Sequence, residues 1–243
     1  RRRGRRRPST RLRGRHVAVT DPRPTAAVSP APRRAVPPIV ALEGIDGAGK
    51  TTLAAALCTR LAEAGWRPRS SRLSPQMGMA MRRLVDEPTG GAQRYQDVVP
   101  SGFRHAVYVM EAAVQFTYMA EAADPADLYV FDRWLQTYDA YCEPPAVHAE
   151  WVRAVAATVP VPDVLAYVRI SPEVAAQRLA ARGDWTAEHW SADALAAELR
   201  ERHEAYESMD WPAGTVVVDG ARPADEVLAA LVAAVEERCA HTP

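Results

Sequence analysis

Apolar and polar positions are arranged in alternating blocks that predict a parallel β-sheet covered by helices. Residues 39–42 form a continuous apolar run, which is typical of a strand buried on both faces. Comparable runs lie at residues 128–131, 164–170 and 215–218, and residues 69–73 form a weaker and more polar strand candidate. Five strands are therefore expected.

The intervals between these runs carry helical periodicity. Leu53, Leu57 and Leu61 recur at spacings of four, and Gly65 follows where a helix can end. Residues 87–100 are rich in turn formers and are expected to form a loop. Strand and helix alternate, which predicts an α/β fold with a doubly wound five-stranded parallel sheet. The other expected helices cover residues 79–85 and 192–206, follow Ser171 and Pro172, begin at Pro223, and include one long helix with an apolar stripe of Phe103, Val107, Met110, Val114 and Tyr118.

A glycine-rich segment, GIDGAGKTT, joins the first strand to the first helix. Gly44, Gly49, Lys50 and Thr51 satisfy the pattern GxxxxGK[ST], in which glycines let the backbone approach a phosphate and successive N–H groups point at its oxygens. The helix that follows adds the positive end of its dipole. Lys50 is also the only lysine in the chain. The segment predicts a P-loop that binds a nucleoside triphosphate.

Side chains around this loop have the types that phosphoryl transfer uses. We expect Lys50 to contact the β and γ phosphates of ATP, and the Thr51 hydroxyl to hold Mg²⁺. Asp132 follows the buried run 128–131, so it lies at the sheet edge where ligands collect, and is expected to bind Mg²⁺ directly or through water. An alternative role for Asp132 is the N-cap of the next helix, but the adjacent Arg133 favours the phosphoryl-transfer site.

Two arginines, Arg178 and Arg182, lie four residues apart and therefore on one helical face, just before Gly183. One interpretation is that they clamp the ATP phosphates from a mobile lid over residues 178–191. The other is that they are solvated helix charges, because exposed arginines usually are. Their spacing leaves both interpretations open.

The zero net charge hides an uneven distribution. Residues 1–38 hold twelve arginines and one aspartate, a formal +11, which leaves −11 for the rest of the chain. An arm so rich in Arg and Pro and so poor in apolar periodicity is expected to be disordered. It is interpreted as a tether for nucleic acid or another anionic surface, as a targeting segment, or as residues upstream of the true start.

The remaining residues, 39–240, are numerous enough for one domain with a sizeable core. Cys58, Cys142 and Cys239 are odd in number and lack metal-ligand spacing, which predicts reduced thiols in a cytoplasmic protein. No stretch approaches about 18 consecutive apolar residues, so no membrane span is expected.

Several motifs together resemble those of the thymidylate kinase family: GIDGAGKTT, DRW at residues 132–134, RISPEVAAQRLAARG, LRERHEAYESM and TVVVDGARPADEV. The resemblance covers residues 39–238. It implies a P-loop kinase domain over residues 39–240 with a short helical lid, and transfer of the γ-phosphate of ATP to the phosphate of dTMP with Mg²⁺. It also implies a homodimer.

The resemblance carries roles for individual residues. Asp46 matches a residue that approaches the acceptor's sugar or a water on Mg²⁺, and Arg133 matches one that bridges the phosphoryl groups. Phe116 matches the aromatic residue that stacks on thymine, and Tyr141 the tyrosine that crowds a ribose 2′-hydroxyl. Some members carry an arginine where this loop has Ala48, so the catalytic cation is expected from the lid. The residues expected to bind ATP or to supply that cation are Gly44, Asp46, Gly47, Gly49, Lys50, Thr51, Thr52, Arg178 and Arg182.

Departures from the family pattern fall on the acceptor side. Ala120 stands where an arginine would bind the acceptor's monophosphate, Gln76 stands in place of another arginine, and Tyr138 in place of the Asn or Ser that reads the thymine edge. Gln76 and Tyr138 are still expected to face the acceptor. The lid segment carries Trp185 and Trp190 and few basic residues. Losing one charge-assisted contact to a phosphate removes about 1.5–3 kcal/mol. Three other arginines are candidates to bind the acceptor's phosphate instead: Arg82, Arg83 and Arg104. The alternative for each is an ordinary exposed charge on a helix.

The leading hypothesis is an ATP- and Mg²⁺-dependent kinase of thymidylate-kinase type. Two acceptors remain open: dTMP or a related pyrimidine monophosphate, and a different, unphosphorylated small molecule of specialised metabolism. From another functional class, the chain is interpreted as a nucleotide-binding regulator without acceptor chemistry, or as a nucleic-acid binder tethered by its basic arm.

Overall fold

The computed structural model describes residues 37–73, 76–122, 126–143 and 148–239, except the side chains of residues 118–122. These ranges belong to one unit, Val36–Pro243. The arm predicted over residues 1–38 lies outside the described residues apart from its last two, and so do the side-chain predictions for Tyr118 and Ala120.

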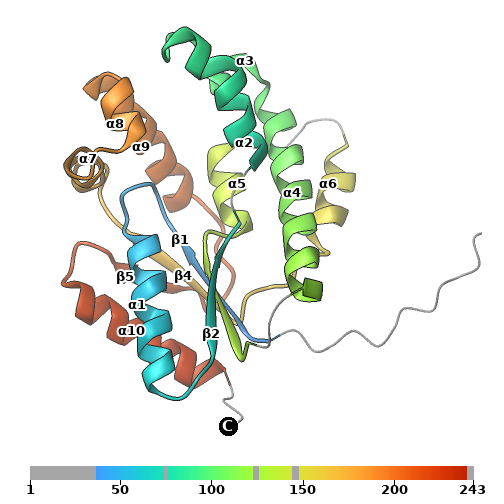
Figure 1. The fold of residues 1–243 in the computed structure, drawn as a ribbon, viewed down its shortest axis with the longest axis vertical. Coiled ribbons are helices and arrows are strands. Elements are labelled where there is room, and N and C mark those ends of the chain that lie inside the picture. The colour runs from blue at the N-terminus through green and yellow to red at the C-terminus, as the bar shows by residue number, and fades with distance from the viewer. Residues whose placement is uncertain (1–36, 74–75, 123–125, 144–147, 240–243) are drawn as a thin grey trace, which may run out of the picture. The chain divides into compact units, whose positions relative to one another are not determined.

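Five strands form one parallel sheet in the order β2-β3-β1-β4-β5. The sheet grows to one side of the central β1 in the first half of the chain and to the other side in the second half, which is the doubly wound arrangement (Figure 1). The predicted strands are confirmed to within one residue. They are β1 (Ile39–Glu43), β2 (Pro68–Arg72), β3 (Leu128–Asp132), β4 (Val164–Arg169) and β5 (Val216–Asp219).

Helices cover both faces of the sheet, and alternate residues of β1 serve the two faces. Val40 and Leu42 belong to a core shared with α1, α7, α9 and α10, whereas Ile39 and Ala41 belong to a core shared with α4, α5 and α6. This double coverage explains why the run at 39–42 is apolar throughout. The helices and helical turns are α1 (Lys50–Glu63), α2 (Gln76–Met81), η1 (Arg82–Asp86), η2 (Glu87–Thr89), α3 (Tyr95–Val98), α4 (Ser101–Ala122), α5 (Leu135–Tyr141), α6 (Ala149–Ala156), α7 (Pro172–Ala181), α8 (Trp185–His189), α9 (Ala192–Glu207) and α10 (Ala224–Arg238).

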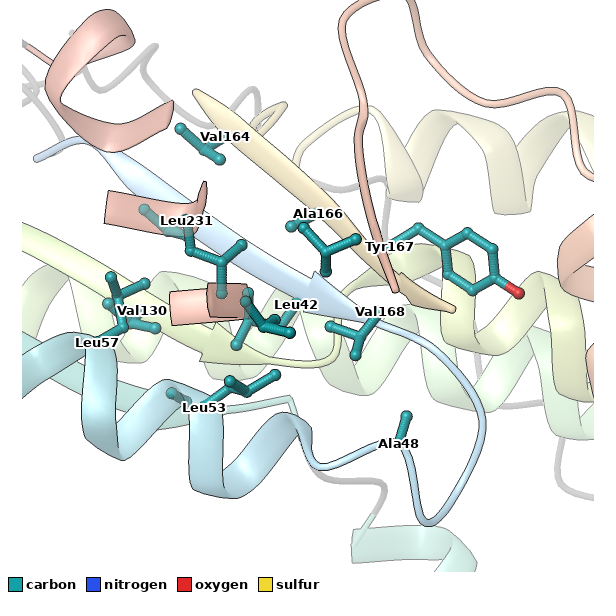
Figure 2. Close-up of a cluster of buried hydrophobic side chains, with 14 of the residues drawn as sticks. Leu42, Ala48, Leu53, Leu57, Val130, Val164, Ala166, Tyr167, Val168 and Leu231 are labelled. Carbon is teal, nitrogen blue, oxygen red and sulfur yellow. The ribbon is translucent and has the colours of Figure 1, made fainter. Parts of the chain in front are cut away.

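The first of these cores lies directly under the predicted P-loop. Figure 2 shows Leu53 and Leu57 of α1 facing Leu42 and Val130 of the sheet, with Leu231 of α10 beside them. Leu42 and Leu57 have no exposed surface. The core therefore holds the strand and the helix on either side of the loop in a fixed relation.

The long helix was predicted correctly, but of the described residues in its predicted apolar stripe only Val107 packs against the core, and it is only partly buried. Phe103, Met110 and Val114 of the predicted stripe are 58%, 44% and 68% exposed. The helix carries a second apolar stripe with the same period, and periodicity alone does not decide which stripe faces the sheet. The residues that pack into the core are Tyr108, Val109, Ala112 and Phe116.

The segment before this helix also differs from the prediction. The helix expected at 79–85 begins at Gln76 and continues as a π turn, and the loop expected at 87–100 contains η2 and α3. Asp86 explains the difference, because its buried carboxylate accepts a hydrogen bond from the N–H of Tyr95 at 2.6 Å and folds the segment on itself. The Ser171 start signal is confirmed, since its Oγ accepts a hydrogen bond from the N–H of Val174.

Within the described ranges, none of the helices combines the length and apolar character that crossing a membrane requires.

Leu42→Ala should lower the free energy of unfolding by about 2–5 kcal/mol, because it leaves a cavity at the centre of the core. The matched control is Leu84→Ala, since Leu84 is 77% exposed and its truncation should cost under about 0.5 kcal/mol. Urea unfolding measures both variants. Equal losses of stability would contradict the assignment of this core.

Candidate functional site

The predicted P-loop joins β1 to α1 at the carboxyl edge of the sheet. Gly44 and Gly47 have φ angles of 142° and 85°, in the region that favours glycine. A Cβ atom on Gly44 would lie 2.6 Å from the carbonyl oxygen of Val168, and one on Gly47 would lie 2.7 Å from that of Ala175. Both positions therefore require glycine for close packing as well as for backbone conformation.

Lys50 begins α1 and is folded back over the loop. Its Nζ donates hydrogen bonds to the carbonyl oxygens of Gly44 and Ile45, each at 2.8 Å. Burial, with the positive charge of Arg133, lowers the pKa of Lys50 to about 7. The ammonium group thus donates to backbone carbonyl oxygens, and the charged oxygens of a bound phosphate would accept stronger hydrogen bonds from it than these carbonyls do.

Thr51 and Asp132, the two predicted Mg²⁺ ligands, are in direct contact. The Thr51 hydroxyl donates to Oδ2 of Asp132 at 2.5 Å. The other oxygen, Oδ1, is buried and has no hydrogen-bond partner among the described residues. No group of three or more His, Cys, Asp or Glu side chains in the described part of the chain is arranged to hold a metal. The pair fits Mg²⁺, which commonly uses one or two protein ligands together with substrate phosphates.

Arg133 lies between the phosphate loop and the neighbouring cavity. Its φ angle of 81° is in the left-handed region, which is uncommon for a non-glycine residue. An ion pair with Asp46 holds the guanidinium, and the Tyr141 hydroxyl donates to the second Asp46 oxygen at 3.0 Å. Burial alone would raise the pKa of Asp46, but Arg133 and Lys50 hold it well below its usual range. Asp46 is therefore a carboxylate that orients Arg133.

Glu43, which was not predicted as a site residue, lies beneath this arrangement. Its fully buried carboxylate accepts hydrogen bonds from the N–H groups of Trp134 (2.8 Å) and Thr137 (3.0 Å) at the start of α5. It also accepts from the hydroxyls of Thr137 (2.6 Å) and Tyr206 (2.9 Å). Burial raises the pKa of Glu43, while these hydrogen bonds oppose the rise. The sequence did contain a signal for Glu43, because it is an acidic residue at the end of an apolar strand.

A cavity of about 370 Å³ opens beside Arg133, between the segment 78–96, α4 and α5 on one side and α7 to α9 on the other. It is the candidate acceptor site. Predicted residues that line it are Asp46, Arg133, Tyr138, Tyr141 and Arg182.

Two of the residues predicted to face the acceptor lie elsewhere. Phe116 does not line the cavity, because its ring packs edge-on against Trp134 at a centroid distance of 6.1 Å. Gln76 is exposed, and its N–H donates to a carboxylate oxygen of Glu111 at 2.7 Å. Of the three replacement arginines, Arg82 and Arg104 line the cavity, whereas Arg83 is exposed outside it.

Sequence reasoning missed other lining residues, among them Arg72 and Tyr108. Arg72 is the last residue of β2, and its Nε lies 4.0 Å from Oδ2 of Asp132. Asp132 was predicted as a site residue because polar residues at the carboxyl ends of parallel strands lie at the same edge of the sheet. The same argument would also have identified Arg72. No pattern distinguished Tyr108, because the predicted core stripe of α4 lay on another face.

The two lid arginines lie at different parts of the site. Arg178 donates to the carbonyl oxygen of Gly220 at 3.0 Å, and its Nη1 is 3.9 Å from where a Cβ of Gly49 would lie. Arg182 pairs with Asp184 at 2.5 Å and lines the cavity. One arginine therefore borders the phosphate loop and the other borders the candidate acceptor site.

A glycine-rich phosphate loop in a doubly wound parallel sheet, with an Asp–Thr pair and a buried arginine beside it, defines the class of P-loop nucleotide-binding phosphotransferases. The family model described as thymidylate kinase matches residues 42–231, and the chain belongs to the thymidylate kinase family. It is therefore a kinase of the nucleoside monophosphate kinase class.

Individual relatives agree with this membership. The chain is 32% identical over 205 residues to the thymidylate kinase of Xanthomonas campestris pv. campestris, covering 82% of this chain and 85% of the relative. It is 31% identical over 219 residues to the thymidylate kinase of Xanthomonas euvesicatoria pv. vesicatoria, covering 84% and 88%. It is also 26% identical over 200 residues to a probable thymidylate kinase of Thermoplasma volcanium, covering 77% and 92%.

The lowered pKa of Lys50 predicts that nucleotide binding takes up a proton. Above pH 7 the free protein carries mostly neutral Lys50, and bound phosphates favour its charged form, so the affinity should fall as the pH rises above 7. Calorimetric titration with ATP at pH 8, in buffers of different ionisation enthalpy, should show net uptake of protons.

Lys50→Arg is the control for this measurement, because its guanidinium stays protonated. Proton uptake at pH 8 that is equal in the variant and in the wild type would show that Lys50 is not the source.

Proposed function

We propose that this protein transfers the γ-phosphate of ATP to a pyrimidine nucleoside monophosphate such as dTMP. The observation that carries the proposal is the position of Arg133, which is bound to the phosphate loop through Asp46 and also forms part of the cavity wall. A cation that borders both the phosphate loop and the cavity suits a reaction in which a phosphoryl group passes from one to the other. The similarity to relatives named thymidylate kinase supports the same reaction.

ATP would bind with its phosphates against Gly44, Gly47, Gly49 and Lys50, and the exposed Thr52 follows in the first turn of α1. Thr51 and the unpartnered oxygen of Asp132 fit Mg²⁺. Mg²⁺ held by these residues would neutralise negative charge on the group to be transferred. Arg178 borders the loop from α7 and would contact the donor phosphates.

In the transfer step, the residues of this chain position groups and stabilise charge, and no covalent enzyme intermediate is required. Arg133 would contact both phosphoryl groups, because Asp46 and the Glu43 hydrogen bonds orient the backbone and side chain around it. Arg182 would approach the transferred group from the lid side of the cavity. Arg72 would take the acceptor's phosphate, since it lines the cavity 4.0 Å from Asp132 while Gln76 points elsewhere.

One observation favours a different acceptor. Tyr138, at the position expected to read the thymine edge, is 1% exposed, and its hydroxyl donates to the carbonyl oxygen of Leu73 at 3.3 Å. Together with Tyr95, Tyr108 and Tyr141 it gives the cavity an aromatic lining that would also suit an unphosphorylated ring alcohol. A regulator without acceptor chemistry is a third candidate, although the cavity beside Arg133 supports it less.

The proposed homodimer would use α4. Phe103, Met110 and Val114 are exposed on this helix, where apolar surface of this kind suits contact with a second copy. The three free cysteines, Cys58, Cys142 and Cys239, fit a reducing compartment such as the cytoplasm. Binding of nucleic acid by the arm at residues 1–38 remains a hypothesis that rests on its twelve arginines.

Lys50→Ala should reduce turnover at least a hundredfold (~2.7 kcal/mol) without unfolding the protein, because it removes the one cation of the phosphate loop. Coupled ADP-release assays with dTMP, thymidine and non-nucleotide alcohols would measure turnover and identify the acceptor class. Arg60→Ala, an exposed basic residue on the same helix, is the control. A Lys50→Ala variant with near wild-type rates on any acceptor would contradict the kinase site, and activity confined to unphosphorylated compounds would favour the other acceptor.

Val114→Asp should dissociate the proposed dimer, because it introduces a charge into the apolar face of α4. Sedimentation equilibrium at micromolar protein should give the mass of a dimer for the wild type and of a monomer for the variant. Val161→Asp is the control, since Val161 is 79% exposed in the loop between α6 and β4 and is not part of the apolar face of α4. A wild-type monomer would contradict the proposal.

A further inference from the structure

Arg202 is a buried arginine of α9 to which the proposed transfer step gives no role. Only 8% of the residue is exposed. Its guanidinium donates to the carboxylate of Glu198 at 2.7 Å and to the carbonyl oxygen of Ala140 at 3.2 Å. Burying a charged group is unfavourable unless its donors are paired, so these contacts hold the guanidinium in one place.

The Arg202 guanidinium lies over the ring of Tyr141, and Arg133 lies close to the same ring. The distance from Arg202 Cζ to the ring centroid is 4.8 Å, and the distance from Arg133 Cζ to it is 5.4 Å. Both distances are within the range of cation–π attraction. The Tyr141 ring therefore has two guanidinium groups as neighbours, one from α9 and one from the proposed transfer site.

Tyr141 also contacts the partner of Arg133, which is Asp46. The Tyr141 hydroxyl donates to one Asp46 oxygen at 3.0 Å, and the other Asp46 oxygen accepts from Nη2 of Arg133. The second terminal nitrogen of Arg133, Nη1, is buried and has no hydrogen-bond partner among the described residues. Asp46 therefore holds one side of the guanidinium and leaves the other side as a donor for a phosphoryl oxygen.

Two side chains of α9, one turn apart, make contacts near Arg133. Tyr206 lies four residues after Arg202, so the two side chains project from one face of the helix. The Tyr206 hydroxyl donates to Glu43, which also binds the N–H directly after Arg133. Arg202 contacts the Tyr141 ring, which lies beside the Arg133 side chain. The contacts of α9 therefore reach both the backbone and the side chain of Arg133.

Arg202 is also connected to the lid. Glu198, which pairs with Arg202, lies 3.8 Å from Arg94, and the Arg94 guanidinium lies over the ring of Trp190 in the lid. A continuous series of contacts therefore runs from the lid to Arg202, and from Arg202 to Arg133.

We propose that Arg202 is a positioning residue of the phosphoryl-transfer step and that it acts on Arg133 through Tyr141. Arg202 holds the Tyr141 ring, and the Tyr141 hydroxyl orients Asp46 and the guanidinium that Asp46 binds. Displacing a reacting group or its partner by about 1 Å can lower a rate about a hundredfold, so the loss of this support should affect kcat more than binding. The role rests on the proposed phosphoryl transfer and adds a residue to it.

The test is a double-mutant cycle between Arg202 and Tyr141, with kcat and KM measured for ATP and dTMP. Arg202→Met keeps a long side chain without the charge, and it should lower kcat about tenfold while KM for either substrate changes less than about threefold. Tyr141→Leu should lower kcat at least as much, and the double variant should be no slower than Tyr141→Leu. Arg200→Met is the control, since Arg200 is exposed on the same helix and its replacement should leave kcat unchanged.

A wild-type kcat in Arg202→Met, or losses of kcat that multiply in the double variant, would overturn the positioning role and leave the kinase activity standing. A raised KM for dTMP at unchanged kcat would do the same, because Arg202, which also lines the cavity, would then contact the acceptor directly. Arg202→Lys keeps the charge and serves if Arg202→Met does not fold: its smaller loss of kcat should disappear in the Tyr141→Leu background. Absence of wild-type turnover with any pyrimidine monophosphate would overturn both the proposed function and the positioning role.

Discussion

The hydrogen-bonded carboxylate of Glu43 is the interaction on which the rest of the site depends. It ends the central strand β1, and its four hydrogen bonds join that strand to α5 and α9. Burying a carboxylate is unfavourable, and only such a set of donors makes it tolerable. One donor is the N–H of Trp134, directly after Arg133, so Glu43 fixes the backbone where Arg133 adopts its left-handed conformation. Glu43 thus fixes the position of Arg133, which borders both the phosphate loop and the cavity, although Glu43 itself lines neither.

The lid and the acceptor side are joined by a second kind of contact. Trp185 and Trp190 stand where the resemblance led us to expect basic residues, and each lies under a guanidinium from the opposite wall. Arg82 lies 4.6 Å from the centroid of the Trp185 ring, and Arg94 lies 4.8 Å from that of Trp190. Such cation–π pairs contribute about 0.5–2 kcal/mol each. The positive charge of this region therefore comes from the segment 82–94, which supplies the guanidinium groups, while the lid supplies the aromatic rings that they contact.

Much of the fold follows from local pattern. The strands are recognisable because burial on both faces demands unbroken apolar runs, and the phosphate loop is recognisable because close backbone packing at Gly44 and Gly47 admits no side chain. The helices near the cavity were less predictable. The orientation of α4 was wrong because two of its stripes are apolar. The folding of residues 76–98 relies on side-chain hydrogen bonds, such as the buried one from the N–H of Tyr95 to Asp86, which have no local signature.

The sequence by itself determined the nucleotide-binding half of this protein: the parallel sheet, the phosphate loop and the pair of Thr51 and Asp132. These features are made by backbone geometry and by residues at strand ends, whose meeting at one edge is a consequence of the topology. Only the tertiary structure decided the acceptor half. Its cavity is lined by side chains from β2, α3, α4, α5 and the lid, which are far apart in the chain. Which of them meet, with Tyr108 and Arg72 inside and Phe116 and Gln76 outside, depends on how each helix is rotated against the sheet, and no local pattern records that rotation.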